Sequence, residues 1–380
     1  MAPVVDTRQG SVRGLDRGDH LAFLGVPYAE PPIGRLRFTA PEPLESWSGT
    51  LDAVAFGDAA PQDPFVPASF RASVPESEDC LSLNVYTPAL DGEHRPVLFW
   101  IHGGGFSHGS GSQLAYDGGP LAERGDVVVV TINYRVGALG YLYLGGHGGD
   151  AWGAAANVGQ LDQIAALRWV HDNIERFGGD PGNVTIFGQS AGGAAVATLL
   201  AMPSANVLFH KAIAQSGTAN RLGDTDFAST VTSQYFGRLG IPDANPARLC
   251  SAGVTDLLTA QGPRGPLSPI VDGESLPQNS LSAVRDGVAS HIALMVGTAR
   301  DEQKLYVAPN RPEIDDANSN VRRSPTCHDA PHTGEPGHDG IGPWPGYTPA
   351  DRQTMVFDKT CGVQSAPFET ERAVWESMVG

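Results

Sequence analysis

Residues 183–192 of this 380-residue chain read NVTIFGQSAG, and residues 193–200 continue as GAAVATLL. The β-branched and apolar residues before Gly188 predict a short strand over 183–188, and the small residues after Ser190 predict a compact helix over 191–200. Between them, the pattern G-x-S-x-G predicts a tight turn that exposes a serine hydroxyl at the carboxyl end of a sheet. In a chain with 47 glycines the pattern alone is weak evidence, so the flanking strand and helix matter most. We therefore predict that Ser190 is a nucleophile.

Strand-like and helix-like segments alternate along the rest of the chain. Continuous apolar runs over 95–102 and 126–134 are typical of strands buried on both faces of a sheet. Apolar residues recur at spacings of three and four through 158–177, which predicts a helix ended by the glycines at 178 and 179. Further strands are predicted over 21–28, 81–86, 211–215 and 291–298. This alternation predicts an α/β fold, with a central, mostly parallel sheet and helices on both faces, in one domain spanning 1–380.

The character of the sequence changes near its C-terminal end. Residues 312–350 are rich in Pro, Gly, Asp, Asn and His and show almost no apolar periodicity. A loop of that length is unusual inside a compact domain. We expect this segment to be irregular or disordered.

A second glycine-rich motif, His102 followed by three glycines and Phe106, comes directly after the strand expected over 95–102. Consecutive glycines allow backbone N–H groups to converge on a developing oxyanion without interference from a Cβ atom. We predict that the amides of Gly104, Gly105 and Ala191 form this oxyanion hole; a plain flexible turn is the alternative. His102 precedes the serine in the chain, so we expect a structural role for it.

The composition excludes several classes of partner. Asp and Glu number 42 against 25 Lys and Arg, a formal charge of -17, which would repel nucleic acid. No apolar run approaches the roughly 20 residues needed to cross a bilayer, and no signal-like segment opens the sequence, so we expect a cytoplasmic protein. The four cysteines show no metal-ligand spacing, and no metal or organic cofactor is implied. The oligomeric state stays open.

Taken together, these motifs resemble the type-B carboxylesterases, the family that includes cholinesterases and bacterial para-nitrobenzyl esterases. The resemblance extends over nearly all of residues 3–310. Besides the two motifs above, the matching segments are FLGVPYAEPP at 23–32, EDCLSLNVY at 78–86, NYRVG at 133–137, LDQ at 161–163, ALRWV at 166–170 and FGGDP at 177–181. The resemblance implies an α/β-hydrolase fold and hydrolysis of small-molecule carboxylic esters through an acyl-enzyme, with a Ser-Glu-His triad.

The resemblance also assigns roles to individual residues. The family's triad acid lies in a Gly-Thr-x-x-Asp-Glu segment, which here is residues 297–302 and makes Glu302 the candidate. Its role would be to orient the histidine and stabilise the imidazolium. Two structural ion pairs are implied, Arg37 with Glu78 and Arg135 with Asp162. Cys80 occupies a position that is disulfide-bonded in secreted relatives, but we expect a free thiol here.

The region that should hold the general base departs from the family pattern. Relatives place the histidine much further along, with helices on both sides, whereas here His328 and His332 follow Glu302 closely. We interpret this as internal deletion in the C-terminal third. His328 is the first candidate for the base, His332 is the second, and a third reading is that no histidine reaches Ser190.

Two residues beside the predicted nucleophile are candidates for contact with substrate. Phe106 is expected at the mouth of the site, although a place in the core is a close alternative. Gln189 stands where relatives most often have Glu, so a negative charge near the imidazolium is missing. Because the region that should hold the general base departs from the family pattern, a non-catalytic binding module is the alternative to an active esterase.

Overall fold

The computed structural model describes residues 2–67, 70–148, 152, 156–217, 222–262, 267–299, 302, 353–356 and 362–365. The chain divides into two compact units, residues 1–299 and 300–380. In the second unit, β14 (Gln353–Val356) pairs antiparallel with β15 (Gly362–Ser365). All other elements below belong to the first unit. The prediction of one domain over 1–380 stays a prediction, and the segment 312–350 lies outside the described residues.

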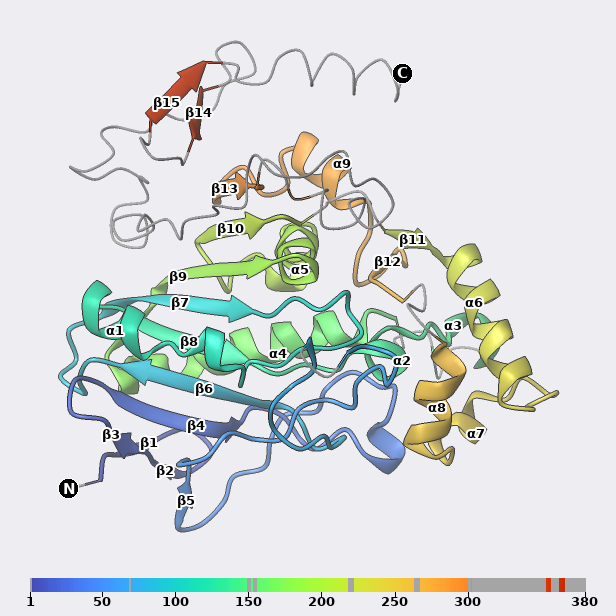
Figure 1. Ribbon diagram of the computed structural model, residues 1–380, viewed down its shortest axis with the longest axis horizontal. Coiled ribbons are helices and arrows are strands. Elements are labelled where there is room, and N and C mark those ends of the chain that lie inside the picture. The colour runs from blue at the N-terminus through green and yellow to red at the C-terminus, as the bar shows by residue number, and fades with distance from the viewer. Residues whose placement is uncertain are drawn as a thin grey trace. The chain divides into compact units, whose positions relative to one another are not determined.

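An eight-stranded sheet forms the centre of the first unit (Figure 1). Its strands in spatial order are β13 (Ala293–Gly297), β10 (Lys211–Gln215), β9 (Gly179–Gln189), β7 (Arg95–Ile101), β8 (Val128–Ile132), β6 (Ser82–Thr87), β4 (Leu21–Pro27) and β3 (Leu15–Asp16). The five strands from β13 to β8 run parallel, and the three at the other edge run antiparallel. Every strand of the sheet except the short β3 lies where the sequence predicts one.

Helices cover both faces of this sheet, as predicted. All seven residues of β7 and all five of β8 are buried. Leu98 and Val129 pack with Ala122 of helix α1 (Gly119–Gly125) on one face. Their neighbours along the strands, such as Phe99 and Val130, pack in the larger core on the other face. Because side chains alternate along a strand, a sheet covered on both sides requires the continuous apolar runs that the sequence contains.

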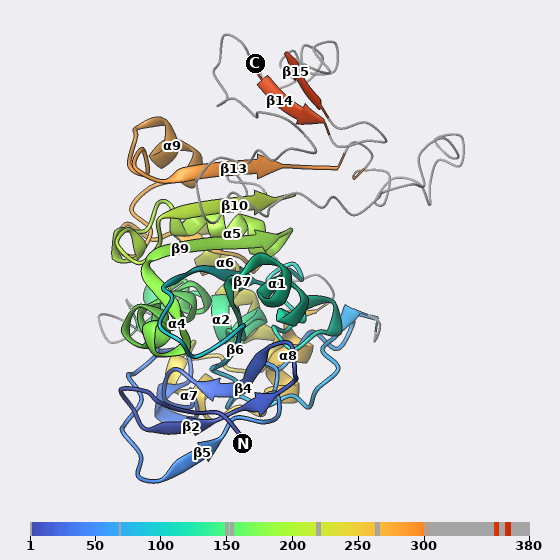
Figure 2. The same ribbon diagram turned by 90° about the vertical axis from the view of Figure 1, so that its left-hand side faces the viewer.

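The larger core contains the two helices that the sequence predicts most clearly. Helix α4 (Val158–Asn173) continues as the 3₁₀ turn η5 (Ile174–Phe177) and ends at Gly178, whose φ is 81°. Helix α5 (Ala191–Leu199) follows β9 directly and packs along β9 and β10 (Figure 2). Most residues of α5 are small, which allows the helix to pack closely against β9 and β10.

The remaining elements of the first unit surround the sheet. A small sheet joins β1 (Val4–Asp6), β2 (Ser11–Arg13) and β5 (Thr50–Asp52), and β11 (Gly223–Asp224) pairs with β12 (Ile270–Val271). The other helices are α2 (Gly137–Tyr141), α3 (Gly145–Gly148), α6 (Thr225–Arg238), α7 (Pro246–Cys250), α8 (Val254–Gln261) and α9 (Ser280–Arg285), with 3₁₀ turns η1 (Gly34–Leu36), η3 (Leu114–Tyr116) and η6 (Pro203–Ala205). Among the described residues, no helix is long and apolar enough to cross a bilayer.

Both ion pairs implied by the family resemblance are present. Arg37 bonds Glu78 through two nitrogens at 2.6 Å each and donates to carbonyls near the end of α7, more than 200 residues away. The Arg135–Asp162 pair is almost completely buried, with 3% and 0% of the two side chains exposed. Cys80 is a buried free thiol, as expected, and burial raises its pKa well above the usual range.

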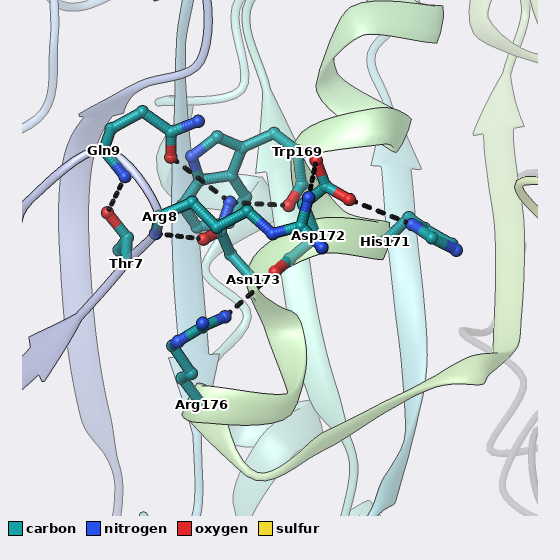
Figure 3. A network of polar contacts seen from close by, with 8 residues as sticks. All are labelled: Thr7, Arg8, Gln9, Trp169, His171, Asp172, Asn173 and Arg176. Atoms are coloured by element: carbon teal, nitrogen blue, oxygen red, sulfur yellow. Dashed lines mark hydrogen bonds and ion pairs between the residues drawn. The ribbon is translucent and has the colours of Figure 1, made fainter. Parts of the chain in front are cut away.

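A polar network joins the N-terminal hairpin to the end of α4 (Figure 3). The buried Asn173 amide accepts from the Arg8 N–H at 2.8 Å and donates to the Trp169 carbonyl at 3.0 Å. The Arg8 guanidinium lies 3.0 Å from Asp172, but both side chains are substantially exposed. An exposed ion pair contributes at most about 1 kcal/mol, whereas leaving buried groups unpaired costs about 1–3 kcal/mol. Of these two contacts, the one to Asn173 therefore contributes more to holding the hairpin on the helix.

Candidate active site

Ser190 occupies the sharp turn between β9 and α5 that the sequence predicts. Its φ and ψ are 58° and -121°, a combination that a residue with a side chain rarely adopts. The Ser190 N–H donates to the Gln215 carbonyl at 2.9 Å, and the Ser190 carbonyl accepts from the Ala194 N–H at 2.9 Å. These two bonds hold the strained backbone in place. The side chain is only half-buried.

The two glycines of the G-x-S-x-G pattern are required by close backbone contacts. A Cβ atom on Gly188 would lie 2.6 Å from the Gly192 carbonyl carbon, and one on Gly192 would lie 2.1 Å from the Ile101 carbonyl oxygen. Both distances are far below van der Waals contact. The turn therefore closes only with glycine at both positions, which is the physical content of the sequence motif.

The glycine-rich loop that follows β7 lies directly beside this turn. Strands β7 and β9 are neighbours, with Ile101 opposite Gly188, so both strands end at the same edge of the sheet. A Cβ atom on Gly103 would lie 3.3 Å from the Ser190 Cβ and 2.6 Å from the Gln189 carbonyl oxygen. The fold thus brings together the two motifs that lie almost 90 residues apart in the sequence.

The loop leaves its predicted oxyanion donors available. The Gly103 carbonyl is 2.8 Å from His102 Nδ1, and the Gly104 carbonyl accepts from the Ser107 and His108 N–H groups at 3.0 and 3.1 Å. Within the described part of the chain, no acceptor is paired with the N–H groups of Gly104, Gly105 or Ala191. Unpaired N–H groups beside a nucleophile are what an oxyanion hole needs.

His102 supports the loop from inside the protein. The residue is 1% exposed, its ring stacks on Tyr134 at a centroid distance of 4.3 Å, and the Tyr134 hydroxyl donates to the His102 carbonyl at 2.8 Å. Because Nδ1 faces a carbonyl oxygen, which only accepts, Nδ1 carries the ring proton. Burial lowers the His102 pKa from 6.5 to about 4. A neutral, buried imidazole agrees with the structural role expected for this residue.

The lowered pKa of His102 makes the fold sensitive to acid. Between the unfolded pKa of 6.5 and the folded pKa of about 4, the unfolded chain binds more protons at this residue. Stability contributed by His102 is therefore present above pH 6.5 and is lost as the pH falls towards 4, by up to about 3 kcal/mol. Urea unfolding at pH 7.0 and 4.5 measures this loss. His102→Asn, which keeps a donor but does not titrate, is expected to lose less, and equal losses in the two proteins would contradict the prediction.

The two residues predicted to contact substrate differ in their surroundings. Phe106 is 8% exposed and packs edge-on against Tyr141 at 5.0 Å, and its carbonyl accepts from the Gly137 N–H at 2.6 Å. Gln189 is exposed at the end of β9. A role in substrate contact stays a prediction for both.

The structure does not test the remaining triad candidates. Glu302 is half-buried and belongs to the second unit. His328 and His332 lie outside the described residues, as do Cys327 and Cys361. The fold thus brings together Ser190, the glycine-rich loop and His102, while the catalytic roles of these and of the other candidate residues stay predictions. In the described segments, no group of His, Cys, Asp and Glu side chains could hold a metal ion.

Sequence reasoning missed two residues that shape the loop. The Gln62 side chain is fully buried and bonds both the N–H and the carbonyl of Gly109, and the Ser107 hydroxyl lies 3.3 Å from the Gly104 carbonyl. Neither belongs to a recognisable motif of chemistry-bearing residues. The available signal for Ser107 was its place directly after the glycine-rich motif, and there was no such signal for Gln62.

Comparison with known proteins gives matches along most of the chain. The family model described as the carboxylesterase family matches residues 1–335. The chain is 42% identical over 318 residues to the para-nitrobenzyl esterase of Bacillus subtilis, an alignment that covers 81% of this chain and 64% of the relative. It is 39% identical over 315 residues to the phenmedipham hydrolase of Pseudarthrobacter oxydans, with coverages of 79% and 62%.

Solved structures give the same result for the fold. A carboxylesterase from Geobacillus stearothermophilus superimposes with a TM-score of 0.88 at 33% identity, covering 98% of this chain and 99% of that chain. A thermophilic para-nitrobenzyl esterase gives a TM-score of 0.90 at 29% identity, with the same coverages. In sequence, however, the chain spans less than two thirds of the length of the two curated relatives above.

Proposed function

Since the chain belongs to the carboxylesterase family and has the α/β-hydrolase fold of its structural neighbours, we propose that it hydrolyses carboxylic esters through an acyl-enzyme on Ser190. The observation that supports this best is the position of Ser190. It occupies a strained turn at the carboxyl edge of the sheet, beside a glycine-rich loop in which the Gly104 and Gly105 N–H groups have no acceptor among the described residues. A serine that only packed in a core would need neither the strain nor the loop.

The proposed reaction has two halves. In the first, Ser190 Oγ attacks the ester carbonyl carbon while a histidine takes the hydroxyl proton, and the tetrahedral intermediate expels the alcohol, which receives that proton. In the second, water attacks the acyl-serine, the histidine takes the water proton, and Ser190 leaves with a proton as the acid is released. His328 is the proposed base, with His332 as the alternative, and Glu302 orients it.

The oxyanion of each tetrahedral intermediate would be held by the backbone. The N–H groups of Gly104, Gly105 and Ala191 are the proposed donors. Losing one such donor typically costs about 10²–10³ in rate, because the charge develops where water is excluded. No protein side chain is needed for this step, in agreement with the glycine-rich sequence of the loop.

The proposed substrates are small-molecule esters. The two relatives are named as a para-nitrobenzyl esterase and a phenmedipham hydrolase, both of which refer to small molecules. Incubation with a fluorophosphonate probe, followed by peptide mass spectrometry, is expected to find the label on Ser190, and p-nitrophenyl acetate is expected to be turned over. A chain that is neither labelled nor active would instead support a non-catalytic binding module.

Gln189 allows a test of the base through its pKa. Replacing Gln189 by Glu places a carboxylate beside the nucleophile, which would favour the imidazolium and raise the pKa of the base. The lower limb of the pH profile of kcat/KM is expected to move to higher pH, and the wild type is therefore expected to stay active at lower pH than the variant. Because the side chain is exposed, the shift should shrink in high salt. An unchanged limb at low salt would contradict the proposal.

A further inference from the structure

The Gly104 carbonyl is held by three donors from one short turn. The Ser107 and His108 N–H groups donate to it at 3.0 and 3.1 Å, and the Ser107 hydroxyl lies 3.3 Å away. At Gly104 the φ is +117°, and a Cβ atom would lie 2.0 Å from the His108 carbonyl oxygen, so only glycine fits this turn. All three donors therefore lie on the carbonyl side of the peptide group between Gly104 and Gly105.

Holding this carbonyl also fixes a proposed oxyanion donor. The carbonyl of Gly104 and the N–H of Gly105 belong to the same peptide group, which is planar and trans, so they point in opposite directions. Bonds that draw the carbonyl into the turn therefore direct the Gly105 N–H out of it. A rotation of this peptide would misdirect the donor without changing any residue that contacts substrate.

The Ser107 hydroxyl has a second partner behind it. His108 Nδ1 lies 3.1 Å from Ser107 Oγ, and the His108 ring is half-buried. A hydroxyl has one proton, so it can donate to Gly104 only if His108 Nδ1 is the donor to Ser107. Burial lowers the His108 pKa, and the charge of the nearby Asp63 partly opposes this effect. Neutral His108 with its proton on Nδ1 then completes the chain from His108 through Ser107 to Gly104.

The rest of the loop is anchored from outside. The Asp63 N–H donates to the Ser107 carbonyl at 3.0 Å, and Gln62 bonds both backbone groups of Gly109. These contacts fix the backbone that follows the turn. Of the described side chains, Ser107 is the one that bonds the Gly104 carbonyl itself.

We propose that Ser107, oriented by His108, is a positioning residue that aims the Gly105 N–H at the oxyanion of the reaction. The inference rests on the proposed function, because it concerns the same reaction. It goes further by assigning to the Ser107 side chain the task of holding the peptide group that carries the Gly105 N–H. Neither residue needs to contact the substrate for this role.

Three single variants and one double variant test the proposal. Ser107→Ala is expected to lower kcat for p-nitrophenyl acetate roughly tenfold with KM unchanged, less than the complete loss of a donor. Affinity for a trifluoromethyl ketone, whose adduct with Ser190 carries an oxyanion, should fall by a similar factor. Ser107→Thr keeps the hydroxyl and should retain most of kcat. His108→Ala should resemble Ser107→Ala, and the double variant should lose no more than the single ones, because both act through one chain of bonds.

Ser112 supplies a matched control. It is a buried serine of the segment just after the loop, and its hydroxyl has no hydrogen-bond partner among the described residues. Ser112→Ala is expected to leave kcat and ketone affinity unchanged. If Ser107→Ala matches the wild type in both while Ser190 is still labelled, the positioning role is overturned and the proposed function stands.

Amide hydrogen exchange tests the positioning separately from catalysis. Peptides that contain the Ser107 and His108 N–H groups are expected to exchange faster in Ser107→Ala than in the wild type or Ser112→Ala. A wild type without turnover or labelling would reject the proposed function, and exchange would then still decide whether Ser107 holds the turn. Equal exchange in all three proteins would overturn the proposal.

Discussion

Replacing Ser190 by alanine is expected to lower kcat for p-nitrophenyl acetate by about 10⁴–10⁶-fold and to abolish labelling by a fluorophosphonate. The magnitude follows from the loss of the covalent step, since the oxyanion donors and the binding contacts alone leave only a small residual rate. Stability should change little, because alanine occupies less space and Ser190 is only half-buried. Kinetics, intact mass after labelling and thermal unfolding measure the three effects.

A second serine shows whether the effect is specific. Ser229 is half-buried in α6, and Ser229→Ala is expected to keep both full activity and full labelling. If Ser190→Ala kept more than about a hundredth of the wild-type rate, a different nucleophile would have to be sought. Labelling of Ser190 without turnover would point instead to a nucleophile whose deacylation partner is not in place.

The parts of the site that were predictable from sequence are local ones. Gly188, Ser190 and Gly192 lie within five residues, and their contacts are set by the tight turn that they form. The loop after β7 likewise lies beside its own strand. Their meeting was predicted from the pairing of the two motifs, and it comes about because β7 and β9 are parallel neighbours that end at the same edge of the sheet. The position of a triad base is not set by a local turn, because it depends on the conformation of the whole segment between Glu302 and His328.

The antiparallel edge of the sheet illustrates a second limit. The run over 21–28 predicts β4 as well as the run over 95–102 predicts β7, but neither says which direction its neighbour follows. Direction depends on the connection, and β4 and β6 are joined by a segment of more than 50 residues that includes η1, β5 and Gln62. The same segment contacts the glycine-rich loop through Gln62, which bonds Gly109. Because Gln62 is not part of a sequence motif, this contact was not predicted.

One buried ion pair connects the core to the glycine-rich loop that follows β7. Asp162 of α4 accepts from the Arg135 backbone N–H at 3.0 Å and from its guanidinium at 2.8 and 2.6 Å. Two residues later, the Gly137 N–H donates to the Phe106 carbonyl at 2.6 Å. The pair therefore fixes the backbone that supports the loop, and its loss should affect folding first and activity second.

Asp162→Asn is expected to lower the free energy of unfolding by about 3–5 kcal/mol, because it leaves the Arg135 charge buried without a counter-charge. The change is nearly isosteric, so the loss would be electrostatic and not a cavity effect. Asp52→Asn is the control, since Arg13 and Asp52 also lie 2.6 Å apart but are 43% and 60% exposed, and it should cost less than about 1 kcal/mol. Urea unfolding of the three proteins measures the difference. Equal losses in the two variants would mean that burial does not set the strength of the pair, and a stable Asp162→Asn with reduced activity would place the role of the pair in the loop and not in the fold.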